Sequence, residues 1–177
     1  MDYLRLEDIS SDYEFKLCRL DVAVKKVVKK FAPQFIGRHI SLHIEQIEDS
    51  VCTDSKWLGF IIEQLISNAV KYSKDGGSVR IYTLHGKGDI KKNSKDDSLQ
   101  LVIEDTGIGI NEEDIPRIME RGFTGYNGRL DRKSSGIGLY LCRKAADRLG
   151  FVITFDASYK NGTRVVIDMT QRYTKHE

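Results

Sequence analysis

Cysteine is scarce in this chain of 177 residues, and the three that occur, Cys18, Cys52 and Cys142, form no Cys-x-x-Cys pair. Their odd number and wide spacing argue against a disulfide framework or a zinc site and favour a reducing cytoplasm. No run of residues is apolar and long enough to cross a bilayer, and the N-terminus lacks the basic-then-apolar order of a signal peptide. We therefore expect a cytoplasmic domain, whose parent protein, if it is held in the cell membrane, has its anchor outside this sequence.

An excess of charge of either sign is also missing, since 28 basic and 26 acidic residues leave a net charge of +2. This balance does not favour a nucleic-acid partner or a membrane surface. The Gly-Lys-Ser/Thr motif of a P-loop does not occur, and no glycine triplet has the spacing of a dinucleotide-binding fingerprint. Hydrophobic residues make up 40% and charged residues 31%, which is typical of a packed globular chain, and the length fits one domain.

Short stretches that alternate between apolar and polar residues, or run apolar, predict β-strands. They cover residues 15–20, 39–47, 50–53, 78–84, 99–105, 151–157 and 163–169. Helical spacing occurs at 22–32, with Asp21 as cap and Pro33 as end, at 55 to about 73, capped by Asp54, and at 139–149, stopped by Gly150. A short helical piece is expected at 111–119, and a solvated hairpin loop at 85–98.

The order of these elements is mixed, and the helices are too few to cover both faces of a sheet. No internal repeat suggests a solenoid or an array. The sequence therefore predicts an α+β fold, in the form of a two-layer α/β sandwich that has a mixed sheet with helices on one face.

The helix expected after Asp54 carries polar residues beside its apolar stripe. Gln64, Asn68 and Lys71 follow one another at i, i+4 and i+7 along the edge of that stripe. An amide oxygen is a hard ligand that suits Mg²⁺, and an ammonium group suits phosphate charge. Alternatively, Asn68 caps or crosses to a neighbouring strand, and Lys71 is only solvated.

Glycines follow the strand at 99–105 and precede the helix at 139–149. Asp105, in "DTGIGI", would be an acceptor at the bottom of an opening that Gly107 and Gly109 leave free. Gly136 and Gly138, in "SSGIGLYL", lead into a helix whose first amides lack internal partners, which is a natural place for phosphate. The alternatives are an ordinary Asx turn at Asp105 and an ordinary loop before the helix.

Taken together and in this order, the motifs resemble the ATP-binding catalytic module of bacterial sensor histidine kinases, in the gyrase, chaperone, kinase and mismatch-repair superfamily. "EQLISNAVKYS" resembles its N box, "DTGIGI" and "SSGIGLYL" its two glycine boxes, and "RGFTG" its phenylalanine box. The likeness runs from about residue 15 to about residue 170. "FTGYNGR" further resembles the small intramembrane-sensing kinases that respond to peptide antibiotics such as bacitracin.

The resemblance implies a Bergerat fold that binds ATP and Mg²⁺. By position, Asp105 would accept the adenine amino group, supported by Thr163, and Asn68 would be the metal ligand. Lys71 and Tyr72 would face the phosphates, and Lys71 and Arg132 would be the catalytic residues. The full set of expected ATP-binding residues is Asn68, Lys71, Tyr72, Asp105, Gly107, Gly109, Ile110, Gly136, Ile137, Gly138, Leu139 and Thr163.

A mobile lid is expected at about residues 112–135, since a long, glycine-rich, polar loop suits a moving cover. Arg129, Arg132 and Lys133 lie in it, and Arg132 is the one favoured to reach the γ-phosphate. The sequence departs from the family at Ser134, where a further glycine is common, and at Gln64, where an asparagine is frequent. These departures bear on the hinge of the lid and on any direct role of Gln64 at the metal.

The acceptor histidine of these kinases lies on a dimerisation helix and is followed by an acidic residue and, a little later, by Pro-Leu, and none of the four histidines here fits that pattern. His39 and His43 fall on a predicted strand, His85 lacks an acidic neighbour, and His176, although Glu177 follows it, lies in the tail with no Pro-Leu after it. Residues 1–14 are expected to be a junction from a preceding dimerisation region, 15–170 the ATP-binding catalytic domain, and 171–177 a C-terminal tail. The implied partners are that dimerisation domain, a response regulator and a transporter of the antibiotic-sensing system.

Other functions of the same superfamily remain open at this point. An anti-sigma-type protein-serine kinase shares the fold, but usually has a shorter lid and lacks the "RGFTG" box. A nucleotide-gated ATPase or switch needs a glutamate that activates water, and Glu63 is expected to point away from Asn68. A degenerate binding module would not need Asp105, Asn68, Lys71 and the glycines together.

Overall fold

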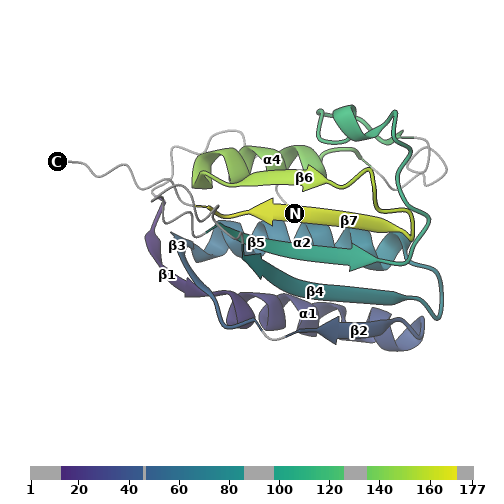
Figure 1. Ribbon diagram of the computed structural model, residues 1–177, viewed down its shortest axis with the longest axis horizontal. Helices are drawn as coiled ribbons and strands as arrows, with labels where there is room; N and C mark the ends of the chain where they lie inside the picture. The colour runs from purple at the N-terminus through teal and green to yellow at the C-terminus, as the bar shows by residue number, and fades with distance from the viewer. Residues whose placement is uncertain (1–12, 46, 86–97, 126–134, 171–177) are drawn as a thin grey trace, which may run out of the picture.

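The computed structural model describes residues 13–45, 47–85, 98–125 and 135–170. A five-stranded sheet has the order β2 (Ser41–Ile44), β4 (Ser78–His85), β5 (Leu99–Asp105), β7 (Thr163–Asp168) and β6 (Val152–Phe155). β2 is parallel to β4, and the other neighbours are antiparallel. Helices α1 (Leu20–Gly37), α2 (Ser55–Tyr72) and α4 (Gly138–Leu149) lie together on one face of this sheet (Figure 1). The predicted two-layer α+β sandwich is confirmed.

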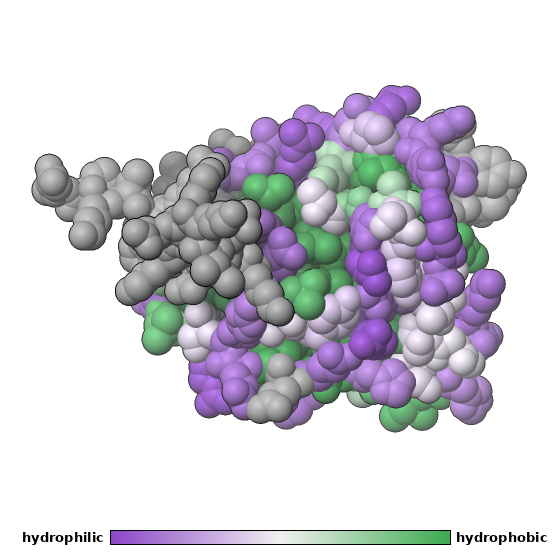
Figure 2. Space-filling view, viewed as in Figure 1, coloured by the Kyte–Doolittle hydropathy of each residue, from purple (hydrophilic) through white to green (hydrophobic). Residues whose placement is uncertain are grey.

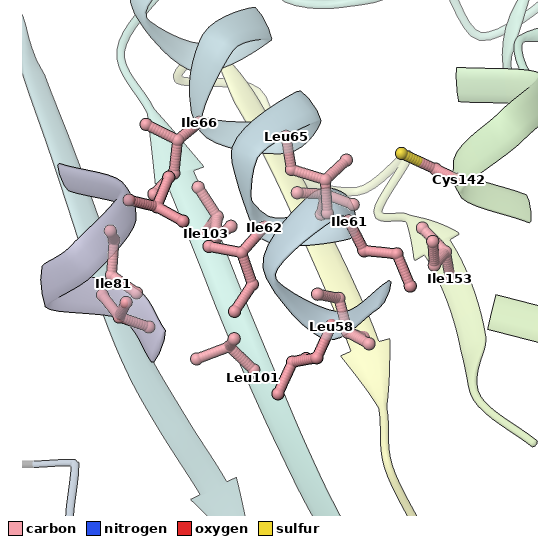
Figure 3. Close-up of a cluster of buried hydrophobic side chains, with 14 of the residues drawn as sticks. Leu58, Ile61, Ile62, Leu65, Ile66, Ile81, Leu101, Ile103, Cys142 and Ile153 are labelled. Atoms are coloured by element: carbon pink, nitrogen blue, oxygen red, sulfur yellow. The ribbon is translucent and has the colours of Figure 1, made fainter. Parts of the chain in front are cut away.

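Helix α2 is the centre of the core. Asp54 caps it as predicted, because its Oδ1 accepts hydrogen bonds from the amides of Lys56 and Trp57 at 2.9 and 3.1 Å. In Figure 3, its apolar side chains lie between those of β4 and β5 on one side and those of α4 and β6 on the other. Each large side chain buried in this way contributes about 1.5–3 kcal/mol. The buried residues of α2 are Trp57, Leu58, Ile61, Ile62, Leu65, Ile66, Ala69 and Val70.

A separate two-stranded ribbon leads the chain into the domain. β1 (Phe15–Arg19) pairs antiparallel with β3 (Ser50–Asp54). Beside the ribbon, Tyr13 stacks on the buried Trp57 with ring centres 5.9 Å apart, and Trp57 makes an edge contact with Phe60 at the same distance. These aromatic contacts fix the first described residues against the start of α2.

Helix α1 departs from the prediction at both ends. It begins at Leu20, and Asp21 is no cap but lies in the first turn, where it pairs with Arg19 and Lys25. Pro33 does not end the helix, which continues to Gly37. A proline removes one backbone hydrogen bond. Pro33 lies at an exposed position near the end of α1, where losing that bond destabilises the helix little.

The other described strands and helices agree with the expected elements except at 111–119, and the expected hairpin loop at 85–98 lies outside the described residues apart from its two ends. Helix α4 ends at Gly150, whose φ of 74° is the left-handed conformation of a C-terminal cap. The predicted short helix at 111–119 is only the 3₁₀ turn η2 (Ile115–Arg117) with turns around it. Among the described residues, no helix is both long and apolar enough to cross a membrane.

The face of the sheet away from the helices carries a ladder of alternating charges. Glu104 on β5 is almost fully buried between Arg80 on β4 and Arg164 on β7, and accepts a hydrogen bond from Arg164 Nε at 2.6 Å. Arg80 also pairs with Glu45, and Arg164 with Asp156. Figure 2 views this face, on which hydrophobic side chains gather in the middle among hydrophilic ones. Because Glu45 and Asp156 lie directly after β2 and β6, the ladder runs from one edge of the sheet to the other, on the face that no described helix covers.

Candidate nucleotide-binding site

A cavity of about 250 Å³ opens between the C-terminal half of α2, the strands β5 and β7, and the start of α4. Its walls are apolar near the sheet and polar near the ends of the helices. The residues that line it are Gln64, Leu65, Ser67, Asn68, Ala69, Lys71, Tyr72, Ile103, Asp105, Gly109, Ile110, Asp114, Ile118, Phe123, Thr124, Gly125, Ser135, Gly136, Gly138, Leu139, Phe155, Thr163 and Val165.

Most of the predicted site residues therefore meet in one place. Asn68, Lys71, Tyr72, Asp105, Gly109, Ile110, Gly136, Gly138, Leu139 and Thr163 all line the cavity. Gly107 and Ile137 lie next to it without lining it. Arg132 falls outside the described residues, as do Arg129, Lys133 and Ser134.

Asp105 lies at the sheet end of the cavity, at the last position of β5, and only 5% of its surface is exposed. Its Oδ1 accepts hydrogen bonds from the amides of Gly107 at 2.8 Å and Thr163 at 3.3 Å. Burial raises the pKa of Asp105 to about 6, although these hydrogen bonds act in the opposite direction. The carboxylate of Asp105 is therefore a hydrogen-bond acceptor whose position is fixed by two amides in a largely apolar surrounding.

Gly107 is required by the backbone beside it. A Cβ at this position would lie 2.2 Å from the carbonyl oxygen of Tyr72 and 2.7 Å from Oδ1 of Asp105. The next amide, that of Ile108, donates to the same Tyr72 carbonyl at 3.2 Å. The absence of a side chain at Gly107 thus allows the end of α2 to join the loop that follows Asp105.

The C-terminal end of α2 brings Asn68, Lys71 and Tyr72 to the polar side of the cavity. Lys71 Nζ lies 5.1 Å from the centre of the Tyr72 ring. Arg38, directly after α1, donates to the carbonyl oxygens of Val70 and Ser73, and its Nε donates to Asp75 at 2.8 Å. A cation that binds the last carbonyls of a helix stabilises that end, so Arg38 holds the turn on which Lys71 and Tyr72 lie.

The loop before α4 closes the opposite wall. The amide of Gly122 donates to the carbonyl of Gly136 at 3.0 Å, so the two ends of the segment between them meet. Gly136 has a φ of 66°, and a Cβ there would lie 2.6 Å from the backbone carbon of Gly122. Ile137, the N-cap residue of α4, makes no capping hydrogen bond with its side chain. The first backbone amides of α4 therefore remain as hydrogen-bond donors at this end of the cavity.

Several lining residues were not predicted. Leu65, Ile103 and Val165 belong to the apolar stripes of α2, β5 and β7, and their pattern predicts only that they lie in the hydrophobic core. Asp114 lies in the expected lid at about residues 112–135, and Phe123 belongs to the "RGFTG" motif, but neither was expected as a nucleotide-binding residue. Gln64 was recognised on the same line as Asn68 and Lys71, and that spacing correctly indicates its place in the cavity.

The histidines lie elsewhere in the part of the chain that the structure describes. His43 is exposed on β2, and His39 is exposed just before that strand. The expectation that His85 lacks an acidic neighbour is wrong, because its Nε2 lies 2.7 Å from Oδ1 of Asp49. That pair is formed by residues distant in sequence, which the sequence alone does not reveal. The His85–Asp49 pair lies at the C-terminal end of β4, whereas Val79, which pairs with Asp105, lies at the other end of that strand.

The lining of the cavity offers groups that could hold a purine nucleotide and a metal ion. Apolar walls suit a flat base, and the carboxylate of Asp105 at their inner end is an acceptor for an exocyclic amine. Asn68 offers an amide oxygen, a hard ligand suitable for Mg²⁺, and Lys71 offers positive charge nearby. The start of α4 adds backbone donors for phosphate oxygens.

Comparison with known proteins agrees with this geometry. Residues 53–172 match the family described as histidine kinase-, DNA gyrase B-, and HSP90-like ATPase. The sensor protein BceS of Bacillus subtilis (strain 168) is 35% identical over 159 residues, which cover 90% of this chain and 45% of BceS. The sensor histidine kinase YxdK of the same strain is 32% identical over 162 residues, which cover 91% of this chain and 47% of YxdK.

A shorter match joins the chain to the sensor protein kinase GraS of Staphylococcus aureus (strain MRSA252), which is 39% identical over 120 residues, or 68% of this chain and 32% of GraS. The chain thus spans less than half the length of these relatives.

Solved structures share the fold. The mycobacterial sensor histidine kinase MprB superposes with a TM-score of 0.70 at 21% identity, over 88% of this chain and 97% of that one. The Acinetobacter baumannii histidine kinase AdeS gives 0.69 at 20% identity, over 94% and 72%. The chain therefore belongs to the histidine kinase-, DNA gyrase B- and HSP90-like ATPase family, in which its relatives are sensor histidine kinases.

Proposed function

We propose that this domain binds Mg–ATP and donates the γ-phosphate to a histidine on a separate dimerisation domain, for relay to a response regulator. The observation that carries the proposal is the buried carboxylate of Asp105 at the inner end of a cavity whose outer end holds Asn68, Lys71 and the start of α4. An acceptor for adenine and a polar end for polyphosphate are the two features that ATP requires. They occur here at opposite ends of one space.

The base would lie against the apolar walls, with its amino group donating to Asp105. The amides of Gly107 and Thr163 orient this carboxylate from two sides. Guanine presents a carbonyl where adenine has its amine, and two acceptors facing each other repel. The arrangement therefore favours adenine over guanine.

The polyphosphate would lie between α2 and the start of α4. Asn68 would hold the magnesium ion, whose charge offsets that of the phosphate oxygens when it is bound. Lys71 and the first amides of α4 would bind phosphate oxygens, with Tyr72 beside Lys71. Arg132, in the expected lid at about residues 112–135, remains the candidate for the γ-phosphate.

Catalysis would consist of positioning and charge stabilisation, with no covalent step on this chain. The acceptor histidine would come from a dimerisation domain joined through residues 1–14, while residues 15–170 form the catalytic domain and 171–177 a tail. A parent protein in the cell membrane and a response regulator as the next partner are part of the same proposal, which the relatives support only through their names as sensor protein and sensor histidine kinase. A transporter of an antibiotic-sensing system is proposed as a further partner.

The orientation of Glu63 disfavours a hydrolytic ATPase. This residue, the only glutamate of α2, forms an ion pair with Lys30 of α1 at 2.7 Å and does not line the cavity. Gln64 occupies the equivalent direction toward the cavity, and an amide cannot take a proton from water as a carboxylate does. We therefore favour phosphate transfer over water activation.

The test is the melting temperature of the chain with a nonhydrolysable ATP analogue, with and without magnesium. A ligand that binds only the folded state stabilises it by about 2.7 kcal/mol at a hundredfold excess over Kd. We expect a clear rise with the analogue, a larger rise with magnesium present, and little or none with the matching GTP analogue. An unchanged melting temperature with the ATP analogue, or an equal rise with both nucleotides, contradicts the proposal.

A further inference from the structure

The side chain of Gln64 reaches across the cavity to the start of α4. A Cβ built on Gly138, the first residue of α4, would lie 2.6 Å from Oε1 of Gln64 and 3.7 Å from its Cδ. The carboxamide therefore occupies the space that a side chain at position 138 would fill. Both residues line the cavity, one turn of α2 from Asn68.

Nothing in the backbone explains why position 138 is a glycine. Its φ is not in the left-handed range, unlike that of Gly136, so an alanine would suit the first turn of a helix there. Among the described residues, no atom other than those of Gln64 lies within 4 Å of the Cβ built on Gly138, apart from its chain neighbours and its own helix backbone. The contact with Gln64 is thus the reason for the missing side chain that the described residues show.

The loop that leads into α4 is fixed from the other side as well. Gly136 packs against the backbone of Gly122 and Phe123, and the Gly122 amide bonds to the Gly136 carbonyl. Residues 136–138 are thus held between that backbone on one side and Gln64 on the other. If Gln64 moved, residue 138 would lose its contact on the α2 side, while Leu141 and Cys142 one turn further on would stay packed in the core.

We infer that Gln64 is a positioning residue, which acts through Gly138 to set the distance between α2 and the first amides of α4. In this way it places the donors of α4 opposite Asn68 and Lys71, at the spacing that a polyphosphate needs. The inference rests on the proposed function, because it concerns the phosphate end of the same cavity. It assigns a role to the length of the Gln64 side chain, independent of any charge.

The inference is tested with two substitutions and their combination. Gln64→Asn shortens the side chain by one methylene and leaves a gap, and Gly138→Ala adds a methyl group that displaces the carboxamide. Each alone is expected to weaken the binding of Mg–ATP by roughly fivefold to thirtyfold, as for residues in direct contact. In the double variant the methyl group fills the gap, so the affinity is expected to return to within about threefold of the parent.

A second readout separates positioning from general damage. AMP lacks the β- and γ-phosphates, so its affinity, followed by chemical-shift titration, is expected to stay near that of the parent in all three variants. Glu63→Gln, next to Gln64 but directed toward Lys30, and Gly59→Ala, where a built Cβ meets nothing within 4 Å, serve as controls. Both should keep the parent affinity for Mg–ATP.

The inference is overturned if the single variants bind Mg–ATP as the parent does, if the two losses multiply in the double variant, or if AMP affinity falls in parallel. A parent chain that binds no adenine nucleotide would instead overturn the proposed function itself. The two failures are therefore distinguishable in one set of titrations.

Discussion

Asp105 is a buried acceptor whose hydrogen bonds to the amides of Gly107 and Thr163 fix its direction. Asp105→Asn keeps the size of the side chain but replaces one oxygen by a donor. We expect ATP affinity to fall by about 1.5–3 kcal/mol, or roughly tenfold to a hundredfold, which is typical of a hydrogen bond to a charged group. Calorimetric titration measures the change, and unchanged affinity for ATP would remove Asp105 from base recognition.

The pKa of Asp105 adds a pH dependence. Burial raises it from 3.8 to about 6, so the free protein takes up a proton at this carboxyl as the pH falls through about 6. The protonated form is a poorer acceptor, and ATP affinity is expected to fall below that pH. The same shift stabilises the fold most below pH 3.8, and this contribution is lost as the pH rises through about 6.

The control for this pH dependence is Asp105→Asn, which cannot titrate. The phosphates of the nucleotide titrate equally in both titration series, so the ratio of the two affinities isolates the carboxyl group. A ratio that stays constant across pH 6 would show that Asp105 does not change its charge there.

Asn68 gives a prediction about metal rather than base. Asn68→Ala removes the amide oxygen proposed to bind magnesium, while the contacts near Asp105 remain. We expect the variant to lose most of the gain in affinity that magnesium gives the parent, and to bind ADP without metal about as well as the parent does. Titrations with and without magnesium measure this, and a full magnesium effect in the variant would place the metal on other groups.

Among single residues, polar residues that recur at helical spacing were predictable from the sequence as members of the site. The spacing of Gln64, Asn68 and Lys71 indicated one line along α2, and all three do line the cavity. The packing of Gly107 against Tyr72 and the pairing of His85 with Asp49 were not predictable. Both depend on contacts between segments that are distant in sequence, which no local pattern encodes.

At the level of elements, one of the two aspartates predicted to cap a helix does so and the other does not. Asp54 caps α2 because its Oδ1 accepts from the amides of Lys56 and Trp57, while the amide of Glu14 binds only the other oxygen, Oδ2. Asp21 gave the same signal, but Arg19 and Lys25 bind its carboxylate and the helix starts before it. Pro33 breaks a helix only where its lost hydrogen bond matters, and near an exposed end it does not.

Replacing the cap tests how much of the fold depends on α2. Asp54→Ala removes acceptors for the amides of Lys56 and Trp57, and also for that of Glu14 on the incoming chain. We expect the free energy of unfolding to fall by about 0.5–2 kcal/mol. Urea denaturation measures it, with Asp54→Asn, which keeps an acceptor oxygen, as the matched variant that should lose less. Equal losses in both variants would show that charge, and not capping, is what matters.

The whole molecule was predictable in class but not in topology. Mixed order and few helices indicated a two-layer sandwich, and that is the architecture found. The placement of β7 between β5 and β6, and the pairing of β1 with β3 outside the main sheet, were not predicted. Strand order depends on which edges meet in the folded state, and the alternation within each strand is the same for any order.

Whether a histidine of this chain can accept the phosphate depends on where the histidines lie in the whole molecule. An imidazole must approach the γ-phosphate in line, and His39 and His43 belong to the β2 region of the scaffold, away from the cavity. His85 is held by Asp49 at the end of β4 opposite to the Asp105 pairing. We expect the isolated chain to bind Mg–ATP, to hydrolyse it slowly at most, and to gain no stable phosphohistidine.

Incubation with γ-labelled ATP checks this expectation, because phosphohistidine is labile in acid and stable in alkali. A dimerisation helix pair with its own histidine, added in excess, should become labelled in trans. Asp105→Asn in the same assay should reduce that labelling in proportion to its loss of affinity. Strong alkali-stable label on this chain alone would mean that one of its own histidines is an acceptor.

The aromatic stack at the entry to the domain gives the molecule a built-in optical reporter. Trp57 is the only tryptophan in the sequence, and it lies between Tyr13 and Phe60 at the start of α2. Lys71 lies fourteen residues further along the same helix, about 21 Å away at 1.5 Å per residue. We therefore expect the emission of Trp57 to respond to changes where the chain enters the domain and not to the nucleotide, which would let movements at the junction be followed without any added label.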